Sequence, residues 1–152
     1  MAAEISLGYF TGSIETVIDA LVAARLEGAM LELEGEALDG FEQFIEEINA
    51  AHPELADGNR RATEAFKIGP IRIGTGPSRV PIEGDNLARL RAISDPGFIT
   101  ELSVRDEKGS LLEAHDVGDG EIWVSERMPD DAVARMRAVL APGLRPPPGD
   151  PA

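Results

Sequence analysis

Alternation of apolar and polar residues between positions 98 and 124 constrains the fold more than any other feature of this chain. Three runs place every second side chain on one face, which is the pattern of a half-buried strand. Turn sequences separate the runs at residues 106–109 and at Gly118-Asp119-Gly120. Short turns between such runs reverse the chain and pair neighbouring strands side by side. The segment therefore predicts an antiparallel meander of three strands.

Further strands are predicted earlier in the chain. Residues 5–10 read as an opening strand, and residues 29–34 alternate so that Glu32 and Glu34 should project away from the core. Residues 63–73 also favour strand, with a break at their Gly-Pro pair, and residues 74–81 are expected to form a loop.

Four segments carry apolar residues at the spacing of an amphipathic helix. Polar residues that can cap a helix precede three of them, and a proline opens the fourth. Glycine or proline follows where a helix should stop. The expected starts are Thr11 or Ser13, Asp39, Asp85 or Asn86, and Pro129, and the expected stops include Gly28 and Pro53.

This order of elements predicts an α+β fold with a single mixed or antiparallel sheet. We expect about five to six strands, ending in the C-terminal β-meander, and about three to four helices packed mainly on one face. A chain of 152 residues fits one domain, because domains usually hold roughly 100–200 residues. We expect this domain over residues 1–143 and a flexible proline-rich tail over residues 144–152.

Composition narrows the classes of function. The absence of cysteine excludes disulfides, thiol catalysis and thiolate metal sites. No apolar run approaches the ~18 residues of a membrane helix, and no targeting signal is visible, so we expect a cytoplasmic protein. The 28 acidic residues outnumber the 14 basic ones, giving a net charge of -14. Such a field repels nucleic acid and anionic membranes, and we expect neither as a partner.

The charge is distributed unevenly along the chain. Residues 1–58 hold 13 acidic residues and only one basic residue, Arg25, whereas residues 59–92 hold seven basic residues against three acidic ones. Two interpretations follow. The central arginines either neutralise carboxylates within the fold, or leave a basic patch beside an acidic face that meets partners.

Two histidines limit the options for acid–base chemistry. His52 ends the second predicted helix, where a cation would cap the negative helix end, with catalysis as the alternative. His115 shares a strand face with Glu113, and this pair could perform catalysis while Arg72 or Arg79 binds an anionic substrate. The alternative is that the pair lies on the solvent face of the meander, with Glu101, Arg105 and Trp123 as ordinary cross-strand neighbours.

Other motifs carry little chemistry. The Gly74-Thr75-Gly76 segment has two glycines of a phosphate loop but lacks both the third glycine and the Gly-Lys-Ser/Thr ending. The carboxylates of Asp116, Asp119 and Glu121 lack the spacing of a calcium loop, and no nucleophile elbow or zinc-protease motif occurs. We therefore expect no metal centre and no cofactor.

Trp123 lies between two apolar strand residues and should face away from the core, either as an interface anchor or beneath a helix or the tail. Together with the acidic first segment, it favours a non-catalytic module that binds a basic protein partner, similar in size and composition to acidic immunity or inhibitor proteins. The alternative is a small enzyme or ligand-binding domain that uses Glu113 and His115 with an arginine-lined anion site. The candidate partner-binding residues are Glu32, Glu34, Glu42, Glu46 and Trp123.

Overall fold

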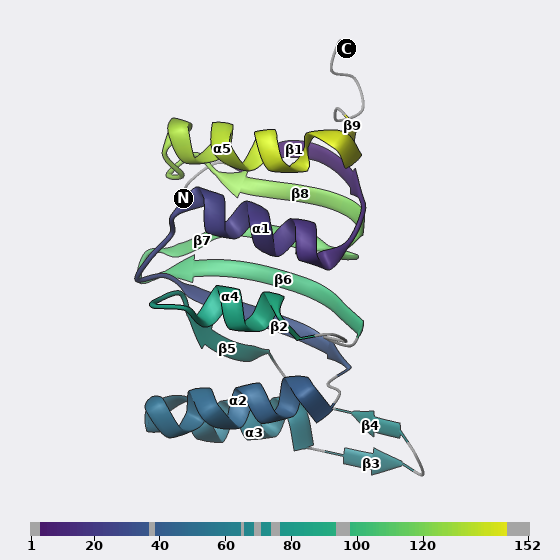
Figure 1. Cartoon of the computed structure of the whole chain (residues 1–152), viewed down its shortest axis with the longest axis vertical. Coiled ribbons are helices and arrows are strands. Elements are labelled where there is room, and N and C mark those ends of the chain that lie inside the picture. Colours follow the sequence, from purple (N-terminus) through teal and green to yellow (C-terminus); the bar gives the residue numbers. More distant parts are fainter. Residues whose placement is uncertain are drawn as a thin grey trace.

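The structure is a computed structural model that describes residues 4–36, 39–64, 66–68, 71–73, 77–93 and 98–145 (Figure 1). The α-helices are α1 (Ile14–Ala24), α2 (Asp39–Ala51), α3 (Ala56–Glu64), α4 (Asn86–Arg91) and α5 (Asp130–Leu140). Two short 3-10 helices are η1 (Pro53–Leu55) and η2 (Ala141–Gly143). The strands are β1 (Glu4–Thr11), β2 (Met30–Glu36), β3 (Phe66–Ile68), β4 (Ile71–Ile73), β5 (Ser78–Pro81), β6 (Phe98–Asp106), β7 (Gly109–His115), β8 (Asp119–Ser125) and β9 (Leu144–Arg145).

The strands confirm the predicted α+β class. Within the described residues, seven strands form one sheet in the order β5-β2-β6-β7-β8-β1-β9, while β3 and β4 form a separate pair. Neighbouring strands run antiparallel throughout, and β6, β7 and β8 form the predicted meander. The main sheet has more strands than expected, because Ser78–Pro81 forms an edge strand instead of a loop and Leu144–Arg145 pairs with β1. Residues 146–152 of the expected tail lie outside the described residues.

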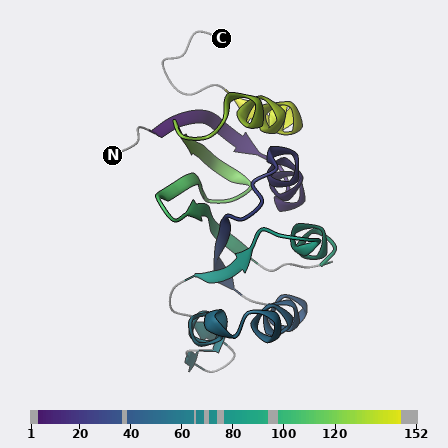
Figure 2. The same cartoon turned by 90° about the vertical axis from the view of Figure 1, so that its left-hand side faces the viewer.

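The helices α1, α2, α4 and α5 are gathered on one side of the main sheet, and α3 lies at its β5 edge. Figure 2 shows α1, α4 and α5 along one face, with α2 continuing this layer beyond the β5 edge. No helix of the described part of the chain covers the opposite face. None of the described helices is long and apolar enough to cross a membrane. The sheet therefore has one face in the core and one face without a helical cover.

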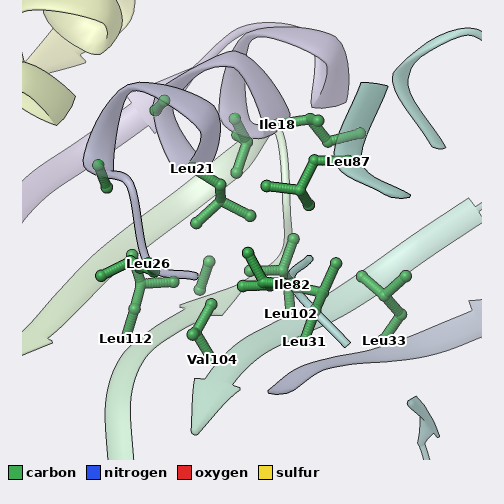
Figure 3. Close-up of a cluster of buried hydrophobic side chains, with 14 of the residues drawn as sticks. Ile18, Leu21, Leu26, Leu31, Leu33, Ile82, Leu87, Leu102, Val104 and Leu112 are labelled. Atoms are coloured by element: carbon green, nitrogen blue, oxygen red, sulfur yellow. The ribbon is translucent and has the colours of Figure 1, made fainter. Parts of the chain in front are cut away.

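Alternation along the strands builds the core and selects the uncovered residues. Leu31 and Leu33 of β2 point toward the helices together with Leu102 and Val104 of β6, and all four are buried (Figure 3). Burial of one such side chain stabilises the fold by roughly 1.5–3 kcal/mol. A shift of one residue would place these side chains in water, so burial also fixes the direction of the polar residues between them. Helix side chains that meet them include Ile18, Leu21 and Leu87.

The end of α1 differs from the prediction. Ser13 caps its start, since its Oγ accepts a hydrogen bond from the Thr16 amide at 3.2 Å. The helix ends at Ala24, before Gly28, because Arg25 takes a left-handed conformation with φ 56°. The guanidinium of Arg135 in α5 donates to the carbonyl oxygens of Ala23 at 2.7 Å and Ala24 at 3.3 Å. A neighbouring helix thus satisfies carbonyls that the end of α1 leaves free.

Helix α3 was not predicted, and the strand expected from residue 63 begins only at β3. Pro53 stops α2 as predicted, but the chain becomes helical again after η1. The side chain of Asn59 in α3 bonds both backbone groups of Arg79 in β5: its Oδ1 accepts from the amide at 2.6 Å, and its Nδ2 donates to the carbonyl at 3.0 Å. The same Nδ2 also donates to Asn49 Oδ1 at 2.9 Å. Asn59 therefore occupies the edge of β5 as a neighbouring strand would.

Replacement of Asn59 should destabilise the protein. In Asn59→Ala the backbone amide and carbonyl of Arg79 lose their partners at a position where Asn59 is only 1% exposed. We expect the free energy of unfolding, measured by urea titration, to fall by about 2–3 kcal/mol. The control is Asp57→Asn on the exposed side of α3, which should change stability by less than about 0.5 kcal/mol. Equal effects of the two substitutions would contradict this role of Asn59.

Candidate functional site

Polar residues of neighbouring strands lie in register on the face of the main sheet that no described helix covers. Glu32 of β2 lies opposite Ser103 of β6, which lies opposite Glu113 of β7. Glu113 in turn lies opposite Trp123 of β8, and Trp123 lies opposite Ser6 of β1. We call a group of outward residues on the central strands the open face, with Arg105 of β6 at its margin; the group comprises Glu32, Glu34, Glu101, Ser103, Glu113, His115, Glu121 and Trp123.

A second row of the open face concentrates ionisable groups. Glu34 of β2 lies opposite Glu101 of β6, and Glu101 lies opposite His115 of β7. A shallow pocket of about 170 Å³ opens between the two rows. Its walls include Glu32, Glu34, Glu101, Ser103, Glu113 and His115. The sequence prediction that Glu113 and His115 share a strand face is confirmed.

The imidazole of His115 lies between two carboxylates. Its Nδ1 contacts Oε2 of Glu101, and its Nε2 lies 3.8 Å from Oε2 of Glu113. The hydrogen bond with Glu101 raises the pKa of His115 above the ordinary value of 6.5, against the opposing effect of burial, and the charges of Glu101, Glu113 and Asp116 raise it further. A protonated ring donates from both nitrogens and cannot accept a proton. The arrangement suits a group that balances charge better than it suits a general base.

The turn after β7 fixes the position of this imidazole. Asp116 takes a positive φ of 50°, and the amide of Val117 donates to the carbonyl of Thr100 in β6 at 3.1 Å. Gly118, with φ 97°, approaches β1 so closely that a Cβ at this position would lie 2.9 Å from the carbonyl oxygen of Gly12. The end of β7 is therefore held against both β6 and the end of β1.

Arginines flank the open face without reaching His115. Glu32 lies between Nε of Arg79 at 2.9 Å and Nε of Arg105 at 3.6 Å, and its side chain is 12% exposed. Arg79 belongs to β5, three strands from β7, which is about 14 Å at the usual strand spacing. Arg72 lies in β4 of the other sheet, and its side chain is outside the described residues. The structure therefore does not bring Arg79 together with the Glu113–His115 pair as an anion site.

The five predicted partner-binding residues divide between two surfaces. Glu42 and Glu46 belong to α2, which lies in the helical layer (Figure 2). Glu46 accepts a hydrogen bond from Asn49 at 3.3 Å and lies 3.5 Å from Nε of Arg60, so contacts within the fold already engage it. The members of the set on the open face are Glu32, Glu34 and Trp123.

Several arginines of residues 59–92 pair with carboxylates of residues 1–58. This confirms the interpretation that these arginines neutralise carboxylates within the fold. The pairs are Arg60 with Glu46, Arg79 with Glu32, Arg89 with Glu47, and Arg91 with Asp19. On the open face, by contrast, no arginine or lysine of the described residues pairs with Glu34, Glu101, Glu113 or Glu121. Carboxylates without an arginine or lysine partner among the described residues therefore include this group on β2, β6, β7 and β8, together with scattered exposed positions such as Glu27, Glu107 and Glu126.

The side chains of His115 and His52 both contact carboxylates of other segments. Glu101, which the sequence predicts as a cross-strand neighbour on the solvent face but not as a site residue, contacts His115 more closely than Glu113 does. The register of β6 and β7 places the two residues directly opposite each other. His52 follows the end of α2, and its imidazole contacts two carboxylates: its Nε2 lies 2.7 Å from Oε1 of Glu83, and its Nδ1 lies 3.4 Å from Oε1 of Glu54.

Titration of His115 should report the contact with Glu101. In the wild-type protein, NMR of the imidazole should give a pKa above 6.5, and in Glu101→Gln this pKa should fall toward 6.5 because the strongest carboxylate partner is lost. A raised pKa in the folded state stabilises the fold at pH values below the unfolded pKa, and this contribution is lost as the pH rises through the folded pKa.

The control for this titration is Glu54→Gln, which alters the surroundings of His52 and should leave the pKa of His115 unchanged. A wild-type His115 that titrates at or below 6.5 would show that the contact with Glu101 is absent in solution.

Within the described residues, no group of three or more His, Cys, Asp or Glu side chains has the geometry to hold a metal ion. Comparisons of the chain with protein families, with curated proteins and with solved structures find no match. A function for the protein must therefore be argued from its own residues.

Proposed function

We propose that the protein is a non-catalytic binding module whose open face docks a basic region of a partner protein. The observation that carries this proposal is the row of carboxylates on a sheet face without a helical cover (Figures 1 and 2). Arg79 and Arg105 pair with Glu32 at one side of this face. The other carboxylates pair with no arginine or lysine among the described residues; they are Glu34, Glu101, Glu113 and Glu121.

Charge determines the chemistry of the partner. Lysine and arginine side chains would complement these carboxylates, whereas phosphates of nucleic acids or anionic lipids would be repelled. Complementary fields also accelerate encounter and select among partners, an effect that salt screens over about 10 Å at 0.1 M. A basic protein surface is therefore the occupant that the open face favours.

Two aromatic side chains extend the proposed surface toward β1. Trp123 stands in the central row, and Tyr9 lies opposite Glu121 and is 38% exposed. Aromatic rings provide large contact areas at interfaces and attract cations over their faces. An arginine of the partner could thus pair with a carboxylate and stack on Trp123 at the same time. An uncharged side chain of the partner would make neither of these interactions with its charge.

The catalytic alternative has less support from the geometry. Both ring nitrogens of His115 face carboxylates, and Arg79 pairs with Glu32 instead of approaching the pocket. A cysteine-free, strongly acidic chain with an uncovered acidic face suits a cytoplasmic immunity or inhibitor-type protein that neutralises a basic target.

Neutralising the open face should weaken docking. The test variant is Glu34→Gln/Glu101→Gln/Glu113→Gln, and the probe is an eight-residue arginine peptide at low salt. Trp123 is the only tryptophan of the chain, so its fluorescence reports binding at the proposed surface. Loss of three exposed charge pairs should weaken binding about tenfold, since each pair contributes about 0.2–1 kcal/mol.

The matched control, Glu27→Gln/Glu107→Gln/Glu126→Gln, removes the same number of charges from exposed positions outside the open face. It should retain most of the affinity. Capture from extracts of the native cell should follow the same order, with basic proteins retained by the wild type and the control and lost by the open-face variant. Equal loss in both variants would mean that net charge, and not this face, drives binding.

A further inference from the structure

We infer that His115 and a cationic side chain of the partner compete for Glu101 and Glu113, so that docking on the open face releases a proton and weakens as the pH falls. This inference rests on the proposed function and concerns the regulation of the same surface.

The position of the imidazole carries the inference. The Nδ1 atom contacts Glu101, and the Nε2 atom lies 3.8 Å from Glu113, so the ring lies between carboxylates on neighbouring strands. These carboxylates also line the pocket of the open face. A guanidinium or ammonium group that enters the pocket needs the same oxygen atoms, because both cations are satisfied by carboxylate acceptors. The protonated imidazole of His115 therefore lies between the carboxylates that a cation of the partner would contact.

The other groups around His115 add negative charge. Glu34 of β2 lies opposite Glu101, and Asp116 follows His115 in the turn. Asp119 and Glu121 are the acidic residues of β8. Arg105 is the basic side chain of β6 on this face, and it lies 3.6 Å from Glu32 in the other row. Among the described residues, His115 is thus the titrating cation of this part of the open face.

The proton balance sets the direction of the effect. Docking of a guanidinium beside Glu101 and Glu113 favours the neutral ring, so between the pKa values of bound and free His115 it releases a proton from part of the molecules, while the guanidinium keeps its own proton. At pH values well above or well below both of these pKa values the ring keeps its protonation state on docking and no proton is released. Affinity therefore rises with pH and reaches a plateau, and by reciprocity the bound cation lowers the pKa of His115. For exposed charges the total change should be about two- to fivefold.

The experiment measures binding of the eight-residue arginine peptide to the full chain from about pH 5.5 to pH 8.5 at constant ionic strength. The lower limit keeps carboxylates of ordinary pKa, about 4.3 for glutamate, largely ionised. Fluorescence of Trp123 gives the affinity, and NMR gives the pKa of His115 with and without the peptide. We expect affinity to rise about two- to fivefold across this range and the pKa of His115 to fall in the complex.

Two variants separate this mechanism from general effects of pH. His115→Gln cannot titrate, so its affinity should be independent of pH across this range. His52→Gln removes the other histidine, which contacts Glu83 in the helical layer, and should retain the wild-type pH profile.

The outcomes distinguish the two proposals. Binding that is independent of pH in the wild type, or a His115 pKa that does not change in the complex, would overturn the competition while leaving docking in place. A pH profile that persists in His115→Gln would also overturn it. Absence of peptide binding to the wild type at every pH would instead contradict the proposed function itself.

Discussion

Burial of alternate side chains in the central strands determines the rest of this structure, including the surface proposed to bind a partner. Leu31, Leu33, Leu102 and Val104 point into the core, and each contributes a few kcal/mol through its burial. A strand cannot slip by one residue without exposing this whole set. The acidic residues between them are therefore held on the outward side by the hydrophobic effect acting on their neighbours, although carboxylates gain nothing from being close together.

The features that could be predicted from the sequence are those determined within one strand or helix. Alternation correctly placed Glu32, Glu34 and Trp123 on the outward side, and apolar spacing located α1, α2, α4 and α5. The unpredicted features depend on partners distant in the sequence. Strand β5 pairs with β2 along one edge and is bonded at Arg79 by Asn59, which is 20 residues away. The contact of Glu101 with His115 depends on the pairing of β6 with β7, whose register shifts between Val104 and Arg105.

Net charge proved to be a poor guide to the local field. The first segment is strongly acidic in sequence, yet Arg60, Arg79, Arg89 and Arg91 from the following segment pair with four of its carboxylates. Two of the carboxylates expected to bind a partner, Glu32 and Glu46, are engaged in this way. By contrast, Glu101, Glu113 and Glu121, which pair with no arginine or lysine of the described residues, come from a later segment with a less extreme charge.

The same crowding explains why a histidine is well placed on this surface. Carboxylates on adjacent strands repel one another, and an arginine at position 115 would remain bound to them at every physiological pH because its guanidinium does not deprotonate. An imidazole relieves the repulsion in the free protein and also loses its charge within the range of small pH changes. The acidic face can therefore be stabilised before docking and still present its carboxylates to a competing cation, which a permanently charged residue at this position would not allow.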